Sequence, residues 1–289
     1  MWDFSPDEFI FLVAAGIVAV VGIARWYYAV ARTKSFRPSH AKLVLGIVPL
    51  ALLIVLLVVL QTMADPVWVV GRYDYTLMFM AGGVAWMFVA AAMFALVGVN
   101  ARDDALERSN PAATTIIAGG MTGVMLAYAG SNIGNGPTIW TTLVPAFVAA
   151  LALLATWALL EALTDTAEAI TVERDVATGV RVGTFLACAG AVFGRAMAGD
   201  FDEAAGYGGT MRDFAMAAWP VVAFVIAMVV VHHFARPTVS RPVPSVVAAG
   251  LVPAAAMVAI TLAYLFALGR PYVAPANEYG KPPAVEKAS

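Results

Sequence analysis

The sequence predicts an all-α polytopic membrane protein of about eight transmembrane helices, arranged as four parallel hairpin repeats. Of its 289 residues, 62% are hydrophobic and 12% are charged, whereas soluble globular chains carry about a quarter charged residues. The mean hydropathy is +0.83. Runs of roughly 20 apolar residues, the length that crosses a bilayer as a helix, recur along the chain. These observations exclude a soluble domain.

Eight apolar segments are the expected spans, at residues 9–30, 41–62, 75–98, 112–131, 138–160, 178–198, 213–234 and 244–268. A seven-span alternative omits 178–198, which contains glycines and two arginines. We expect one transmembrane domain over residues 1–268, with hairpins at 9–62, 75–131, 138–198 and 213–268. Residues 269–289 contain several prolines and no apolar periodicity, which predicts a flexible tail. The acidic start of the chain does not resemble the basic start of a signal peptide.

Basic residues predict the orientation, because cytoplasmic loops of membrane proteins are enriched in Lys and Arg. They gather in alternate turns, at Arg32, Lys34, Arg37, Lys42, Arg102, Arg108, Arg174, Arg236 and Arg241. We therefore expect these turns in the cytoplasm and both termini outside it, in a bacterial-type inner (plasma) membrane. The turn at 161–178 has more acidic than basic residues, but acidic residues contribute little to this rule.

Two pairs of segments indicate an internal repeat. The turn before the fourth span, with Asn110 and Pro111, aligns with the turn before the sixth, with Asp175. Residues 46–51 of the second span resemble residues 250–255 of the eighth, and both separations fit a unit of about 68 residues. Each unit holds two spans, so the copies are parallel and not inverted. Asn110 and Asp175 are expected as helix N-caps, with Pro111 in the first turn.

The first of these turns resembles the YjfL-like family of small inner-membrane proteins of unknown function. The resemblance covers residues 75–235, and its best-matched positions are Glu107, Arg108, Asn110, Ala112, Ala113 and Gly119. The second copy departs from it, with Asp175 in place of the Asn and Thr178 in place of an Ala. The family implies a helical membrane protein and no established activity.

Glycines four residues apart allow membrane helices to approach closely. Three such pairs occur, Gly119 with Gly123, Gly179 with Gly183, and Gly190 with Gly194. They predict either a contact between two copies of the chain or packing of the fourth span against the sixth. We favour packing within one subunit, because this spacing is common in membrane helices.

Charges inside a membrane segment are costly and need partners. Arg181 and Arg195 lie near the two ends of the sixth span. We consider ion pairs of Arg181 with Glu161 or Glu173, and of Arg195 with Asp200 or Asp213. A polar path would have these residues at its two mouths. We favour instead that each arginine reaches its own interface, because the residues between them are almost wholly apolar.

Two further groups of polar residues come into consideration. The acidic loop at residues 199–203 lacks the spacing of a calcium loop, so we expect it to be solvated. His40, His232 and His233 fall near the predicted inner interface. They are weak candidates for a metal or haem site, and we favour interfacial histidines, because no ligand spacing supports a site. We expect no cofactor.

The sequence contains no pattern typical of an enzyme, such as a nucleophile elbow or a phosphate-binding loop. Its single cysteine, Cys188, lies in an apolar run, and the net charge of −2 does not favour nucleic acid as a partner. The leading hypothesis is a non-enzymatic structural or accessory component that contacts lipid and other membrane subunits or itself. The rival is a channel or carrier, with a water-filled path lined by Thr114, Thr115, Thr184 and Arg181.

Overall fold

The computed structural model describes residues 4–34, 40–235 and 245–273. In this part of the chain, eight helical segments are long and apolar enough to cross a membrane. The predicted all-α fold with eight spans is thereby confirmed. The seven-span alternative is wrong, because α7 (Val176–Ala196) is a continuous apolar helix of 21 residues. The predicted tail beyond residue 273 lies outside the described residues.

Eight long helices form the bundle: α1 (Pro6–Arg32), α2 (Ala41–Thr62), α3 (Tyr73–Met93), α4 (Pro111–Ser131), α5 (Trp140–Thr164), α7, α9 (Trp219–Ala235) and α10 (Val252–Leu268). Short elements join or extend them: η1 (Phe94–Val97), the π-helices η2 (Ala101–Glu107) and η3 (Val246–Leu251), α6 (Thr166–Thr171) and α8 (Gly206–Ala217). The sequence predicts a seventh span over 213–234. In the structure the helical segment begins earlier, at Gly206, and it is interrupted between α8 and α9. The interruption lies just before Pro220, which has no N–H to continue the helix.

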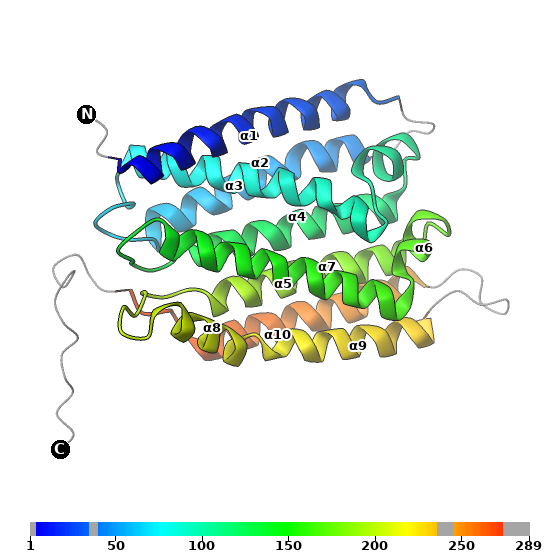
Figure 1. Ribbon diagram of the computed structural model, residues 1–289. Helices are drawn as coiled ribbons and strands as arrows, with labels where there is room; N and C mark the ends of the chain where they lie inside the picture. Colours follow the sequence, from blue (N-terminus) through cyan, green and yellow to red (C-terminus); the bar gives the residue numbers. More distant parts are fainter. Residues whose placement is uncertain (1–3, 35–39, 236–244, 274–289) are drawn as a thin grey trace, which may run out of the picture.

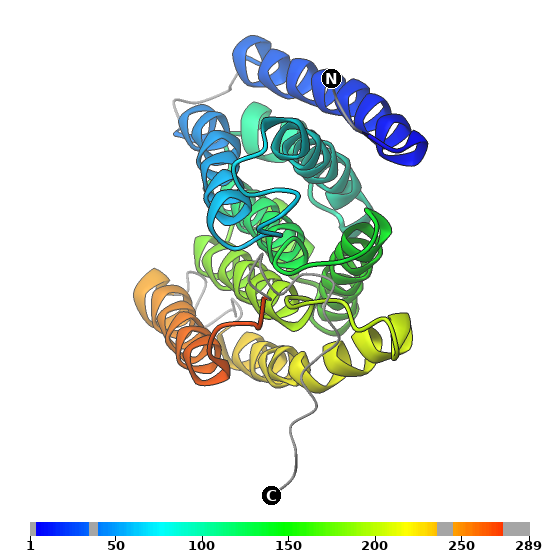
Figure 2. The same ribbon diagram turned by 90° about the vertical axis from the view of Figure 1, so that its left-hand side faces the viewer.

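The helices form two layers, each made of helices that run in the same direction (Figures 1 and 2). One layer holds α2, α4, α7 and α10, in that order across the bundle, and neighbours in this order contact each other. The other layer holds α1, α3, α5 and α9; α1 contacts α3 and α5 contacts α9. Trp86 of α3 meets Phe147 of α5, with ring centroids 6.0 Å apart. α4 and α7 therefore lie at the centre.

The two central helices begin with the same turn. The Asn110 side chain accepts hydrogen bonds from the N–H groups of Ala112 and Ala113, and Asp175 does the same for Ala177 and Thr178. The N-cap prediction is confirmed for both residues, as is Pro111 in the first turn. The residue before each cap has a positive φ, 53° at Ser109 and 59° at Arg174. This conformation is uncommon without glycine.

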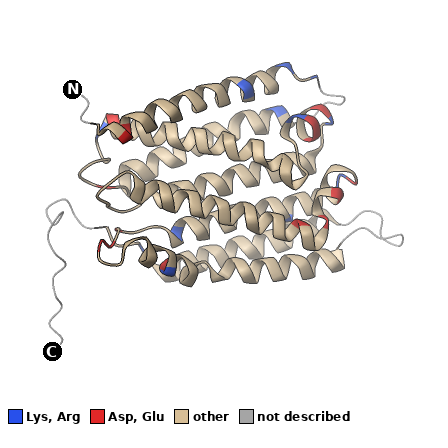
Figure 3. Cartoon of the chain, in the orientation of Figure 1, with Lys and Arg blue, Asp and Glu red and all other residues tan. Residues whose placement is uncertain are grey.

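The two turns also lie side by side. The Arg174 guanidinium donates to the carbonyls of Arg108 and Ser109, and the Asn110 amide donates to the carbonyl of Ile170 at 2.6 Å. Polar contacts thus join the turn before α4 to the turn before α7. Charged side chains gather at both ends of the bundle, and the middle of the spans is almost free of them (Figure 3).

Beyond these turns α4 and α7 are in direct backbone contact. A Cβ atom on Gly119 would overlap the backbone of Gly183, and one on Gly190 would overlap the backbone of Gly123. Likewise, a Cβ on Gly179 would meet Ala112, and one on Gly194 would meet Leu126. All six glycines singled out in the sequence lie at this contact within one chain. Close approach of this kind requires residues without side chains on both helices.

Candidate functional site: two cavities at one end of the bundle

The loops that follow α2, α4 and α7 meet at one end of the bundle, which we call the N-terminal end because α1 begins there (Figure 1). Ala64 and Gly134 form a bridge between the first two loops. The Asn135 N–H donates to Asp200 Oδ1 at 2.8 Å, and the Phe201 N–H donates back to the Asn135 carbonyl at 2.8 Å. The three loops are therefore held together by backbone contacts and by one hydrogen bond to the Asp200 side chain.

The larger of two cavities at this end has a volume of about 430 Å³. It lies between the start of α1, the loop after α2, the start of α3 and the loop after α4. Its wall includes three carboxylates, three aromatic rings and an asparagine: Asp7, Glu8, Asp65, Trp68, Tyr75, Phe79 and Asn132. Among the described lining residues none is basic. The wall therefore has a negative charge and an aromatic side.

Of the two carboxylates at the start of α1, Glu8 forms a capping box with Ser5, and Asp7 lies beside it. Glu8 Oε2 accepts from the Ser5 N–H at 2.8 Å and from the Tyr75 hydroxyl at 3.2 Å. Asp7 accepts from the Ser5 hydroxyl and from the Trp140 indole N–H. Such a box satisfies the free N–H groups at a helix start. These bonds also tie α1 to α3 and α5, which fixes the position of both carboxylates.

Asp65 is the most buried acid of the cavity, with 6% of its surface exposed. Its Oδ1 accepts from the N–H groups of Val67 at 2.7 Å and Trp68 at 3.0 Å. Burial raises the pKa of this carboxyl above its ordinary value; the two N–H bonds lower the pKa, and the negative charge of Asp200 raises it further. Burial disfavours the charged form of an acid that has no cation beside it. Among the described residues Asp65 is bonded to backbone N–H groups and forms no ion pair.

Asn132 ends α4 and lines the same cavity. Its Nδ2 donates to the carbonyl of Tyr128 at 2.7 Å, one turn back along α4. The residue is 5% exposed, and its buried Oδ1 has no hydrogen-bond partner among the described residues. Buried polar atoms without a partner are uncommon and need a physical explanation.

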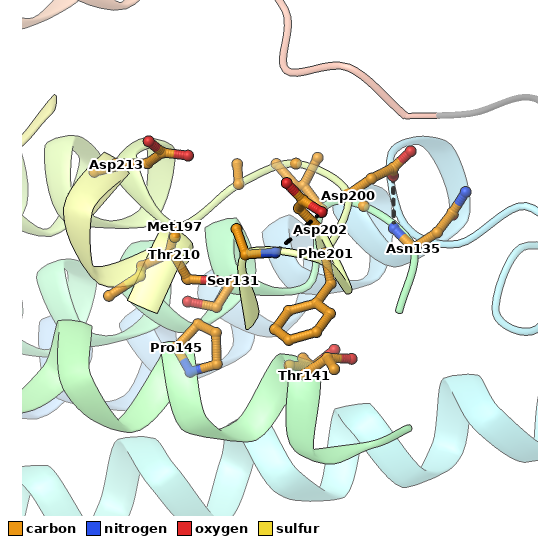
Figure 4. Close-up of a pocket in the computed structure, with 18 residues that line it drawn as sticks. Ser131, Asn135, Thr141, Pro145, Met197, Asp200, Phe201, Asp202, Thr210 and Asp213 are labelled. Carbon is orange, nitrogen blue, oxygen red and sulfur yellow. Dashed lines mark hydrogen bonds between the residues drawn. The ribbon is translucent and has the colours of Figure 1, made fainter. Parts of the chain in front are cut away.

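The smaller cavity, of about 100 Å³, lies between α5, α8 and the loops after α4 and α7 (Figure 4). Asp200, Asp202 and Asp213 line it together with Thr141 and Thr210. Asp202 accepts from the N–H groups of Ala204 and Ala205, so its carboxylate closes a turn. Among the described residues no group of three His, Cys, Asp or Glu side chains is arranged to hold a metal ion.

The expected partners of Arg181 are wrong. Arg181 is fully buried, and it donates to the carbonyl of Ala249 in η3 and to the Thr178 hydroxyl at 2.9 Å. That hydroxyl in turn donates to Asp175. The arginine side chain is thus enclosed by the protein and does not extend to the surface. Glu161 is instead bonded to the hydroxyl of Thr166.

Arg195 also has different partners from those expected. It donates to the carbonyls of Leu268 and Gly269, at distances of 3.2–3.4 Å. It therefore ties the end of α7 to the end of α10 and forms no ion pair with Asp213. Asp213 lies in the wall of the smaller cavity, on α8.

The three histidines do not come together. His40 precedes α2, whereas His232 and His233 lie in the last turn of α9. These two helices lie on opposite edges of the bundle in both views (Figures 1 and 2). His40 therefore cannot share a ligand with the pair. Cys188 is buried, on α7.

Sequence reasoning did not identify the larger cavity, although one regularity points to this end. Asp65, Asn135 and Asp200 each follow the last residue of a long helix, Thr62, Ser131 and Ala196, by three or four positions. Polar residues at equivalent ends of successive hairpins are expected to lie near one another. This pattern does not predict that Asp7 and Glu8 of α1 line the larger cavity.

No family model, no curated protein and no solved structure that was compared with this chain matches it. Its function must therefore be inferred from its own residues.

Proposed function

We propose that this multi-pass membrane protein is a non-enzymatic structural or accessory component of a membrane assembly. The observation that supports this most is the contact of α4 and α7 at the centre of the bundle, where Gly119, Gly123, Gly183 and Gly190 bring the two backbones together. A path along this axis would have to separate the two helices. The centre is thus built for rigidity.

Three of the four residues that would line such a path are engaged in structural contacts. The hydroxyls of Thr114 and Thr115 donate to the carbonyls of Asn110 and Pro111 on their own helix. Arg181 binds the Ala249 carbonyl and is fully buried. Polar groups that are paired within the protein are not available to replace the hydration of a passing solute.

The outer helices leave room for partners. The most apolar windows of α1, α2 and η3–α10 are only 11%, 28% and 22% buried within this chain, compared with 72% for α4 and α7. Their exposed faces are apolar, so lipid or another membrane subunit is expected to cover them. A partner subunit, or a second copy of this chain, fits the proposed role.

We further propose that the chain is a repeat of four parallel hairpins, similar to the YjfL-like family. The second helices of the hairpins begin at Ala41, Pro111, Val176 and Val246, which are 65 to 70 positions apart. The turns before α4 and α7 support this repeat because they share a hydrogen bond. The N–H of Asn110 donates to the carbonyl of Asp104, and the N–H of Asp175 donates to the carbonyl of Ala169, in each case six residues earlier. The excess of Lys and Arg in alternate turns supports a bacterial-type inner membrane with both termini outside the cytoplasm.

Affinity purification from native membranes tests the proposal. The tagged full-length chain, extracted in a mild detergent, is expected to retrieve a specific membrane protein at a fixed ratio. An unrelated eight-span protein with the same tag serves as the control. Retrieval of nothing but the chain itself would contradict an accessory role with other subunits.

A carrier for small solutes is the second candidate, and the two cavities at the N-terminal end favour it, because a solute needs an entry site. Reconstituted vesicles distinguish the two functions. A carrier would give saturable uptake of a solute that empty vesicles do not show, whereas a structural component gives none.

A further inference from the structure

We propose that the larger cavity at the N-terminal end binds a small aliphatic amine through its ammonium group. Its volume of about 430 Å³ lies in the range of small-molecule sites, about 300–1,000 Å³. Asp7, Glu8 and Asp65 give its wall three carboxylates, and none of its described lining residues is a cation. This binding site is independent of the structural role proposed above.

Two of these carboxylates have an oxygen that is not used. The hydrogen bonds within the described chain reach Oδ1 of Asp65 and Oε2 of Glu8. They leave Oδ2 of Asp65 and Oε1 of Glu8 without a donor from the described residues. Hydrogen bonds between a carboxylate and a cationic N–H group are among the strongest that proteins make. The two oxygens are therefore suited to an ammonium group.

Asn132 adds an independent observation. Its amide Nδ2 is bonded to Tyr128, and its Oδ1 is buried in the cavity wall without a partner from the described chain. A carbonyl oxygen accepts hydrogen bonds and cannot donate them. The missing partner is therefore a donor, as an ammonium group is. A ligand that brought N–H groups into the cavity would supply this donor.

The geometry favours a primary ammonium over other cations. The described acidic residues are not grouped to hold a metal ion. The Arg72 guanidinium already lies 5.4 Å from the Trp68 ring and 5.0 Å from the Tyr75 ring, so these two rings already interact with a cation. A quaternary ammonium, which binds mainly to aromatic faces, has no such advantage here. The remaining acceptors are oxygens, which require N–H donors.

The same wall has an apolar part for an alkyl chain. Val69, Phe79 and Ile139 line the cavity and are buried. Chains of a few methylene groups gain about 0.8 kcal/mol for each CH₂ that leaves water. A short diamine or polyamine therefore matches both parts of the wall, with its ammonium at the oxygens and its chain against the apolar residues.

Binding should depend on pH through Asp65. A positive charge beside a carboxyl favours its charged form, and the pKa of this carboxyl is raised in the empty cavity. Where Asp65 is protonated, binding of the ammonium ligand therefore drives the carboxyl to lose its proton to water. The affinity is expected to increase as the pH rises through the pKa of Asp65.

Calorimetric titration of the full-length protein in lipid nanodiscs with cadaverine and spermidine tests the site. We expect saturable binding at one site per chain, weakened about tenfold or more by Asp65→Asn and by Glu8→Gln, since each removes a charged hydrogen bond. Both variants keep an oxygen that can accept the existing backbone N–H bonds. Asp103→Asn, an exposed carboxylate at the opposite end of the bundle, is the matched control and should bind as the natural chain does.

Absence of saturable binding of either amine would overturn the inference. So would equal affinity for choline or Mg²⁺, because the site would then lack selectivity for N–H donors. An equal loss in Asp103→Asn would show a general charge effect and not a site. If Asp65→Asn does not fold, the Glu8→Gln titration decides.

Discussion

The guanidinium of Arg181 donates a hydrogen bond to the carbonyl of Ala249, the carbonyl that lies four residues before Pro253. Proline has no N–H, so the carbonyl four residues earlier loses its usual helical donor. The same relationship occurs in α2, where the Trp26 indole donates at 2.8 Å to the carbonyl of Leu45, four residues before Pro49. In both segments a side chain from a neighbouring helix donates to the carbonyl four residues before a proline.

We predict that Arg181→Met destabilises the protein by about 2–4 kcal/mol, because a buried carbonyl and the Thr178 hydroxyl lose a charged donor. Adding Pro253→Ala should recover part of this loss, since the new alanine would again supply an N–H to the Ala249 carbonyl. The free energies of unfolding of the two single variants and the double variant, measured in detergent, give the coupling. Strict additivity of the two changes would contradict this role of Arg181.

The glycine contact predicts a second effect. Gly190→Ala should lower the free energy of unfolding by about 1–3 kcal/mol, because its Cβ would overlap the backbone of Gly123 and overpacking has costs of this size. Gly16→Ala on α1 is the matched control, since nothing lies within 4 Å of its Cβ position. Thermal unfolding of both variants checks this. Equal melting temperatures would show that α4 and α7 are not in contact.

The turn before α4 should also contribute measurably to the stability of the folded protein. Asn110→Ala removes the cap of α4 and the bond to Ile170, and loss of a cap alone costs about 0.5–2 kcal/mol. Asn110→Ser is the control, because its hydroxyl can cap the helix as the Asn side chain does, while the donor to Ile170 is lost. We expect the unfolding temperature to fall in the order natural chain, Asn110→Ser, Asn110→Ala. If Asn110→Ala melts at the same temperature as the natural chain, the turn before α4 does not stabilise the protein, and the prediction is contradicted.

Asp65 predicts a dependence of stability on pH. Its folded pKa is raised, so its stabilising effect is present below the unfolded pKa of about 3.9 and is lost as the pH rises through the folded pKa. At neutral pH, Asp65→Asn should therefore be more stable than the natural chain, and the difference should disappear in acid. Melting temperatures of both proteins between about pH 4 and 7, the range on either side of a raised carboxyl pKa, provide the measurement. A constant difference over this range would contradict the raised pKa.

Hydropathy predicted the eight spans correctly, because length and apolar composition suffice to define a membrane helix. The caps at Asn110 and Asp175 were also predictable, since capping depends on neighbours in the sequence. The partners of Arg181 were not, because they depend on which helix lies beside α7. The larger cavity was missed for the same reason, as Glu8, Asp65 and Asn132 are far apart in the sequence and meet only through packing.

Accessibility of the central contact to water tests the proposed closed bundle most directly. A cysteine at Leu186 of α7, which is fully buried and whose backbone lies against Gly123 of α4, is introduced in a Cys188→Ala background and treated in intact vesicles with a membrane-impermeant thiol reagent. A cysteine at Thr138, which is exposed at the N-terminal end, serves as the reactive control. We predict rapid labelling at position 138 and none at position 186. Labelling at both positions at similar rates would show a water-filled path and contradict the closed centre.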